Sequence, residues 1–422
     1  MLAFLPVVCF LLAAHLIHRS RLLRYPDGWT DWRESALAAA VVWGVALVAI
    51  TEALSLVTLL TREWVIGAWA VFAVGLVALT FTTGIFRSPP KRPTGTEPGP
   101  VRTRMDRSSA FLLGGIVSVA GLVGITAILS APNTPDALNY HMPRVAHWIQ
   151  NRSLDFYPTT VPWQLSHAPG AEFAILHLQL LSDGDRWANL VQWFAMAGSI
   201  TGVSLLARDL GADRRTQVIA AAVAATIPMG ILQGATAQND YVATFWLVAC
   251  VHFLLRLRAD RDWQFGLVAG AALGLALLTK STAYLFALPF LVWYGLSALR
   301  SLRLSGWKPV LAISLVALAL NAGHYARNYD LYGSPVGPGQ EGPPGTTYGK
   351  YTNDVFTPTT LASNVVRNLA LHTALPGSTV PMVYAIGDLH RQFGADPHDI
   401  RTTWTYQLFD VSPTRTDEDI AG

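Results

Sequence analysis

The stretch SAFLLGGIVSVAGLVGITAILSA (residues 109–131) is followed almost at once by NTPDALNYHMPRVAHW (residues 133–148), and these two stretches together decide the fold. The first is an unbroken run of apolar and small residues, long enough to cross a bilayer core, which needs about 20 residues. The second carries an aspartate, a tyrosine, two histidines and an arginine within twelve positions. We therefore expect an all-α integral membrane protein that presents polar groups at one membrane surface.

The composition also indicates lipid as the main solvent of the chain. Of the 422 residues, 52% are hydrophobic and 14% are charged, whereas soluble domains average about 25% charged residues. The net charge of +3 is too small to indicate a nucleic-acid partner. Cys9 and Cys250 both lie in apolar runs, so we expect neither a disulfide framework nor a thiolate metal site.

Ten segments have the apolar character of membrane spans. They are residues 1–18, 36–60, 64–86, 109–131, 188–207, 217–236, 241–257, 264–279, 283–299 and 309–323. A further apolar piece, residues 171–181, is too short to cross comfortably. We expect it to lie in the membrane interface or to re-enter the membrane.

Basic residues recur in every second loop, over five loops, and this alternation predicts the orientation. The basic loops are expected in the cytoplasm. The large first outer loop (residues 132–187), residues 236–240, the turn at residues 279–281 and the chain after about residue 323 then face outside. These features predict a multi-pass membrane protein with its polar site outside the cytoplasm.

Four regions follow from this reading. Residues 1–86 form N-terminal membrane helices, residues 87–108 a basic Pro/Gly-rich linker, residues 109–325 a transmembrane core, and residues 326–422 an extracytoplasmic segment. The stretch GSPVGPGQEGPPG (residues 333–345) is typical of an irregular, flexible loop. Because the last segment does not return to the membrane, we expect the chain to be a fragment of a longer protein.

The polar stretch after residue 131 has the signals of a helix start. Asn133 or Thr134 can cap it, with Pro135 in its first turn. Pro143 is expected to interrupt this helix, and an amphipathic helix lying flat on the membrane should follow. At helical spacing one face would collect Asp136, Tyr140, Arg144 and His147. Asp136 by itself is also compatible with a simple capping role.

Further charged residues come to the same predicted surface from distant parts of the sequence. Asp240 begins a helix after an outer hairpin, where it could form a turn and cap or belong to a site. Lys280 stands at an outer helix end, against the positive-inside trend, and needs either a carboxylate partner or a phosphate ligand. His324, Tyr325 and Arg327 lie where the last span leaves the membrane. Carboxylates and cations at a lipid surface are what a lipid-phosphate substrate requires.

With these residues in hand, the chain resembles the GT-C superfamily of polyprenyl-phosphate-sugar glycosyltransferases. The resemblance is to family 39, the bacterial relatives of protein O-mannosyltransferases and aminoarabinose transferases. It runs from about residue 109 to residue 340 and is carried by PDALNYHMPRVAHW, QNDY, LLTKSTAYL and HYARNYDLYGSP. The resemblance implies a GT-C-like helical bundle with interfacial helices in its large first outer loop.

The resemblance also implies a reaction: a sugar leaves a polyprenyl phosphate and passes, with inversion, to an acceptor hydroxyl of a lipid, glycan or protein. Asp136 would be the general base, and Lys280 and Arg144 would hold the phosphate. Asp240 would orient the acceptor or a metal ion. Second-line sugar and phosphate contacts would come from Tyr140, His141, His324 and Arg327.

Two departures from the family pattern bear on these roles. Ala137 follows Asp136 where many members carry a second acidic residue, so a divalent cation (Mg²⁺ or Mn²⁺) at Asp136 and Asp240 is left open. Ser281 replaces the usual glycine after Lys280.

A multi-pass transporter or lipid flippase is the alternative function, and a non-catalytic membrane scaffold is a third. A transporter would place ionisable groups near the centres of its spans and Gly/Pro breaks in paired helices. Here the charges gather at helix ends, which favours the enzyme. Glu52 lies within a span and is expected to be paired or to reach the interface.

Overall fold

The computed structural model describes residues 4–20, 31–82, 106–260, 262–302, 307–338, 355, 357–373, 379–399, 401–403 and 409. Most of these residues are helical, and the described residues contain no strand. The chain divides into two compact units, Met1–Arg327 and Asn328–Gly422. Residues 83–105, which hold most of the predicted linker, lie outside the described residues, as do residues 339–345 of the Gly/Pro-rich stretch.

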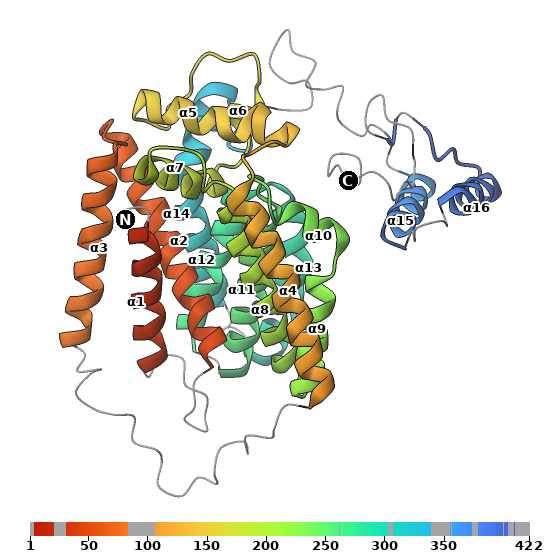
Figure 1. Cartoon of the computed structure of the whole chain (residues 1–422), viewed down its shortest axis with the longest axis horizontal. Coiled ribbons are helices and arrows are strands. Elements are labelled where there is room, and N and C mark those ends of the chain that lie inside the picture. Colours follow the sequence, from red (N-terminus) through yellow and green to blue (C-terminus); the bar gives the residue numbers. More distant parts are fainter. Residues whose placement is uncertain are drawn as a thin grey trace, which may run out of the picture. The chain divides into compact units, whose positions relative to one another are not determined.

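The first unit is a bundle of long apolar helices that run roughly side by side (Figure 1). Among the described residues, seven helices are long and apolar enough to cross a membrane: α2 (Trp32–Leu56), α3 (Arg62–Thr82), α4 (Arg107–Leu129), α8 (Leu190–Asp209), α11 (Asp240–Asp260), α13 (Thr282–Leu302) and α14 (Trp307–Tyr332). Two shorter apolar helices, α1 (Leu5–Arg19) and α12 (Gln264–Thr279), accompany them. The predicted all-α, multi-pass membrane fold is confirmed.

One predicted span is not a single helix. Residues 217–236 were expected to be continuous, but the structure breaks them into α9 (Arg214–Ala225) and α10 (Pro228–Gln233). Pro228 has no N–H for the ladder, and Ile227 before it is extended, with φ −61° and ψ 117°. A residue that precedes proline is disfavoured in the helical region, which explains the break.

The segment 132–187 forms four helical pieces at one end of the bundle. They are the π-helical turn η2 (Ala137–His141), α5 (Met142–Asn151), α6 (Trp163–Ser166) and α7 (Gly170–Ser182). η2 and α5 form one helix that lies across the ends of the membrane helices (Figure 1). Val145 and Trp148 of α5 are buried in the protein core rather than directed to lipid. The expected membrane-facing amphipathic helix is therefore a helix that covers the bundle.

The helix α7 is enclosed by other helices. Residues 171–181 were predicted to lie in the membrane interface or to re-enter the membrane, and in the structure they form α7, which packs against α2, α3, α5 and α12. Phe173, Ile175 and Leu176 are fully buried. Because protein covers the helix on almost all sides, most of its residues are apolar, and its polar residues Glu172 and His177 are buried as well.

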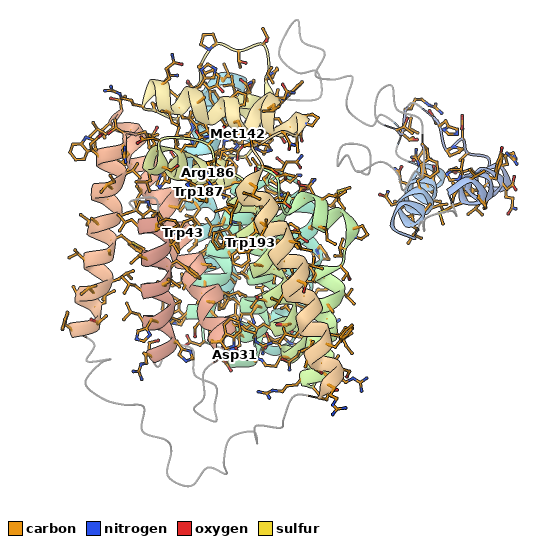
Figure 2. All side chains as sticks on the ribbon, in the orientation of Figure 1. Asp31, Trp43, Met142, Arg186, Trp187 and Trp193 are labelled. Carbon is orange, nitrogen blue, oxygen red and sulfur yellow. The ribbon has the colours of Figure 1, made fainter. Side chains whose placement is uncertain are left out.

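Ionic contacts join the helix ends at the other end of the bundle, and we call this the basic end. Figure 2 shows Asp31 at this end and Met142 of α5 at the opposite one. The ion pairs connect the start of α2 to the last turns of α8 and α11, and we call them the basic-end network: Asp31, Arg33, Glu34, Arg208, Asp209, His252, Arg256 and Asp260. The helix ends that precede or follow basic loops thus meet on one side of the fold, as the alternation of charge predicts.

The second unit contains two helices that the sequence reading did not identify, α15 (Pro358–Thr373) and α16 (Thr379–Gln392). Polar contacts hold them together. The Ser363 hydroxyl lies 2.9 Å from His390 Nε2, and Arg367 donates to the carbonyls of Pro397 and Thr402.

Candidate active site at one end of the helix bundle

The helix that carries Asp136 is shaped by the proline seven residues later. Thr134 caps its start, since its hydroxyl accepts from the N–H of Ala137 at 3.2 Å. Pro143 does not break the helix as predicted, because the π-helical turn η2 widens the backbone before it. Pro143 has no N–H to bond the carbonyl of Asn139. Gln164 Nε2 donates to that carbonyl instead, at 2.7 Å. π-turns of this kind are frequent at functional sites.

Beneath this helix, a buried carboxylate joins η2, α5 and α7. Glu172 Oε1 lies 2.8 Å from Arg144 Nη1 and 3.0 Å from His141 Nδ1, and all three side chains are fully buried. Burial by itself would raise the pKa of Glu172, but the charge of Arg144 and the contact with His141 hold it below its ordinary value. The carboxylate therefore stays ionised in the interior.

Arg144 makes further hydrogen bonds to three main-chain carbonyls. Its Nε donates to Gln164 O at 2.6 Å, and its Nη2 donates to Trp163 O at 2.7 Å and His167 O at 3.0 Å. Arg144 was predicted to hold the donor phosphate and His141 to contact substrate. The structure instead buries both, so that they fix the segment 163–172 under η2 and α5. We no longer assign Arg144 to the phosphate.

Asp136 is held by the tyrosine one turn later. The Tyr140 hydroxyl donates to Asp136 Oδ2 at 3.1 Å, and the Asp136 carboxyl is half-buried. The Tyr140 ring lies against the rings of His141 and His167, with centroids 4.0 and 5.3 Å away. Burial, helped by the charges of Asp136 and Glu172, raises the pKa of Tyr140. Tyr140 therefore remains a hydrogen-bond donor, and the second oxygen of Asp136 is not used by it.

Loop contacts bring the helix ends that carry Asp136, Asp240 and Lys280 to one place. Gln238 Nε2 lies 3.5 Å from the hydroxyl of Thr134, two residues before Asp136. Asn239 Nδ2 donates to the carbonyl of Thr279, one residue before Lys280, at 3.1 Å. Gly170 allows α7 to start directly on this helix end, because a Cβ there would lie 2.8 Å from Thr279 Oγ1. We call this region the site end.

The start of α11 is capped by a buried side chain of a neighbouring helix. Gln192 of α8 accepts from the N–H groups of Tyr241 and Val242, at 3.0 and 3.4 Å. A helix start leaves such N–H groups without intrahelical partners. The Asp240 side chain is thus not needed as the cap, and it points to Lys280 instead.

Asp240 and Lys280 form an ion pair across the ends of α11 and α12. Lys280 Nζ lies 2.5 Å from Asp240 Oδ1, and the two side chains are 32% and 42% exposed, respectively. Burial lowers the pKa of His167 to about 3. The positive charges of Arg144 and Lys280 lower this pKa further, and the negative charge of Glu172 opposes them. His167 is therefore neutral at physiological pH.

Arg327 is also paired, with a residue 275 positions earlier in the chain. Its Nη1 and Nη2 lie 2.8 and 2.7 Å from the two oxygens of Glu52, which confirms the expected pairing of that glutamate. Gly323 makes room for this carboxylate, because a Cβ there would lie 2.5 Å from Glu52 Oε2. His324 is buried on the same helix, one turn before Arg327. Each predicted phosphate-binding cation thus has a carboxylate partner.

Asp136 and Asp240 are the residues predicted as possible ligands of a divalent cation. Among the residues that the structure describes, no three His, Cys, Asp or Glu side chains gather closely enough to bind a metal ion together. Asp136 is bonded to Tyr140 and Asp240 to Lys280. These residues do not form a common ligand set, so we derive no step through a metal ion.

The sequence reading missed residues that organise the site. Glu172 lies in residues 171–181, which were read only for their apolar character, and Gln164 and His167 precede them in the large loop. A signal was available: Glu172 stands alone in an apolar run, and a carboxylate in such a place needs a charged or hydrogen-bonding partner. The sequence could not name Arg144 as that partner.

Comparison with known proteins bears on the identity of the chain. The family model described as dolichyl-phosphate-mannose-protein mannosyltransferase matches residues 166–325. The matched range includes Glu172, Asp240, Lys280 and His324, whereas Asp136 precedes it and Arg327 follows it. No curated protein and no solved structure matches the chain. Over residues 166–325 the chain is thus similar to a family of membrane glycosyltransferases of the GT-C type, in agreement with the resemblance that its motifs indicate.

Proposed function

We propose that the protein transfers a sugar from a polyprenyl-phosphate donor to an acceptor hydroxyl, with Asp136 as the general base. The observation that carries the proposal is the half-buried Asp136 carboxyl, oriented by Tyr140 at the end of the bundle where Lys280 and Asp240 also lie. A carboxylate oriented by a hydrogen bond from Tyr140 to one of its oxygens suits proton removal from a bound alcohol by the other.

The proposed step conserves charge and atoms. The acceptor hydroxyl gives its proton to Asp136 while its oxygen forms a bond to the anomeric carbon of the sugar. The bond from that carbon to the phosphate oxygen breaks, and its electron pair leaves with the polyprenyl phosphate. Lys280 neutralises the charge that grows on the departing phosphate. Attack opposite the leaving group inverts the anomeric centre.

We further propose that the reaction takes place outside the cytoplasm of a bacterial cell, at its inner membrane. The basis is the positive-inside rule, since the basic loops join the helix ends near Asp31, whereas Met142, on the helix that carries Asp136, lies at the opposite end of the bundle (Figure 2). The acceptor belongs to the lipids, glycans or proteins of that surface. The proposal leaves Asp240 the task of orienting the acceptor.

The test is transfer of radiolabelled sugar from a polyprenyl phosphate by the purified protein in liposomes. Asp136→Asn should lower turnover by about 10²–10⁴-fold, the usual contribution of general base catalysis. Asp155→Asn, which changes an exposed carboxyl in the same segment, is the matched control and should keep full turnover. Unchanged turnover in Asp136→Asn would show that Asp136 is not the general base. Labelled lipid that crosses the bilayer without sugar transfer would favour a flippase.

A further inference from the structure

Resting on the proposed function, we propose that the donor phosphate and Asp240 compete for Lys280, so that donor binding releases the Asp240 carboxylate for the acceptor. While no donor is bound, Asp240 is the counterion of Lys280. When the donor binds, its phosphate takes the place of Asp240 at the ammonium. The prediction that follows is an order of binding, with donor first and acceptor second.

The three cations that the sequence predicts to contact phosphate or substrate are each ion-paired, and the pairs differ in how firmly they are held. Arg144 is fully buried and makes four hydrogen bonds around Glu172. Arg327 holds both oxygens of Glu52, and these side chains are about four-fifths buried, with 18% and 20% exposed. The Lys280 ammonium has one carboxylate contact in the described part of the chain, and it is the most exposed of the three cations.

Exchange at Lys280 is also the least costly of the three on physical grounds. Half-exposed pairs contribute little to stability, because water solvates both partners when they separate. A lysine ammonium is a compact point charge that can exchange one anion for another, whereas Arg327 would have to break two hydrogen bonds to Glu52 before it could bind a phosphate. A phosphate with two or more free oxygens can therefore replace the single Asp240 contact without loss of solvation.

The position of Asp240 explains why its release would matter. Gln192 already caps the start of α11, so Asp240 stays in place through its backbone when its side chain is freed. The adjoining residues Gln238 and Asn239 are bonded to Thr134 and Thr279. The freed carboxylate therefore remains at the site end, where the negative charge is favoured by the start of the helix.

The experiment measures binding of farnesyl monophosphate, a short polyprenyl phosphate, to the purified protein in detergent micelles by calorimetry. Asp240→Asn removes the competitor and should tighten binding by about two- to fivefold, the size of a partly exposed ion pair. Lys280→Ala should abolish binding, and farnesol, without the phosphate, should bind none of the proteins detectably.

The matched control is Asp183→Asn, which removes a carboxylate from the exposed pair with Arg62. Asp183 has φ 58°, a conformation that asparagine also adopts readily. The affinity of the Asp183→Asn variant for farnesyl monophosphate should equal that of the unaltered protein. This control separates competition at Lys280 from a general change of net charge.

Turnover supplies a second readout. Asp240→Asn should lower the KM for the donor and also lower kcat, because the donor gains access while the acceptor loses its carboxylate. A merely structural role for the pair would raise KM. If Asp240→Asn binds the probe equally or more weakly while Lys280→Ala still abolishes binding, the competition is overturned and the proposed function survives. If the unaltered protein does not bind the probe, both fail together.

Discussion

At the basic end of the bundle Glu34 is fully buried and Arg256 nearly so, whereas at the site end Asp240 and Lys280 remain well exposed. The basic-end network shares its carboxylates, since Glu34 contacts both Arg256 and His252. The site-end pair is a single contact between two helix ends. The same residue types therefore perform different tasks, because burial with several partners locks helices together, while exposure with one partner leaves a charge free to change its counterion.

The largest expected effect on stability comes from a substitution in the basic-end network. Glu34→Gln should lower the free energy of unfolding by about 3–5 kcal/mol, as happens when one partner of a buried ion pair is removed. The reason is that Arg256 and His252 of α11 lose the carboxylate of Glu34 on α2, which they share in the buried contact between the two helices. Denaturant titration in detergent micelles measures the loss. A change as small as that of a surface pair would mean that the network is not a structural lock.

An intermediate effect concerns the hydrogen bond that orients the base. Tyr140→Phe removes the donor to Asp136, a bond to a charged group worth about 1.5–3 kcal/mol, so turnover should fall by about 10- to 100-fold. Tyr157→Phe is the control, because its hydroxyl bonds Gln164 at 3.3 Å and not Asp136. Steady-state transfer kinetics measure both. Equal losses in the two variants would assign the effect to packing rather than to orientation of Asp136.

The smallest effect is expected at the site-end pair itself. Asp240→Asn should change the free energy of unfolding by less than about 1 kcal/mol, because partly exposed ion pairs contribute little. The same denaturant titration gives this value beside that of Glu34→Gln. A loss as large as that of Glu34→Gln would show that Asp240 and Lys280 hold the fold, and the contrast between the two ends would disappear.

How far the sequence predicted the site can be judged from single residues. The convergence of the segments that carry Asp136, Asp240 and Lys280 follows from the alternation of basic loops, and the structure brings their helix ends together. The structural role of Arg144 could not be predicted from the sequence. Its side chain is buried because α7 packs beneath α5 and supplies Glu172, and the sequence of α7 was read as an interfacial or re-entrant segment. A short apolar run has the same composition in both settings.

The sequence by itself determined that the chain lies in lipid, where most of its membrane helices run, and the end of the bundle at which Asp136, Asp240 and Lys280 lie, because these depend on the composition and spacing of neighbouring residues. Only the tertiary structure decided which charges are paired, since the partners lie far apart along the chain: 28 positions for Arg144 and Glu172, 40 for Lys280 and Asp240, and 275 for Arg327 and Glu52. Pairing depends on distance and burial in the folded bundle. It is this pairing that separates the charges that stabilise the fold from those that can receive a substrate.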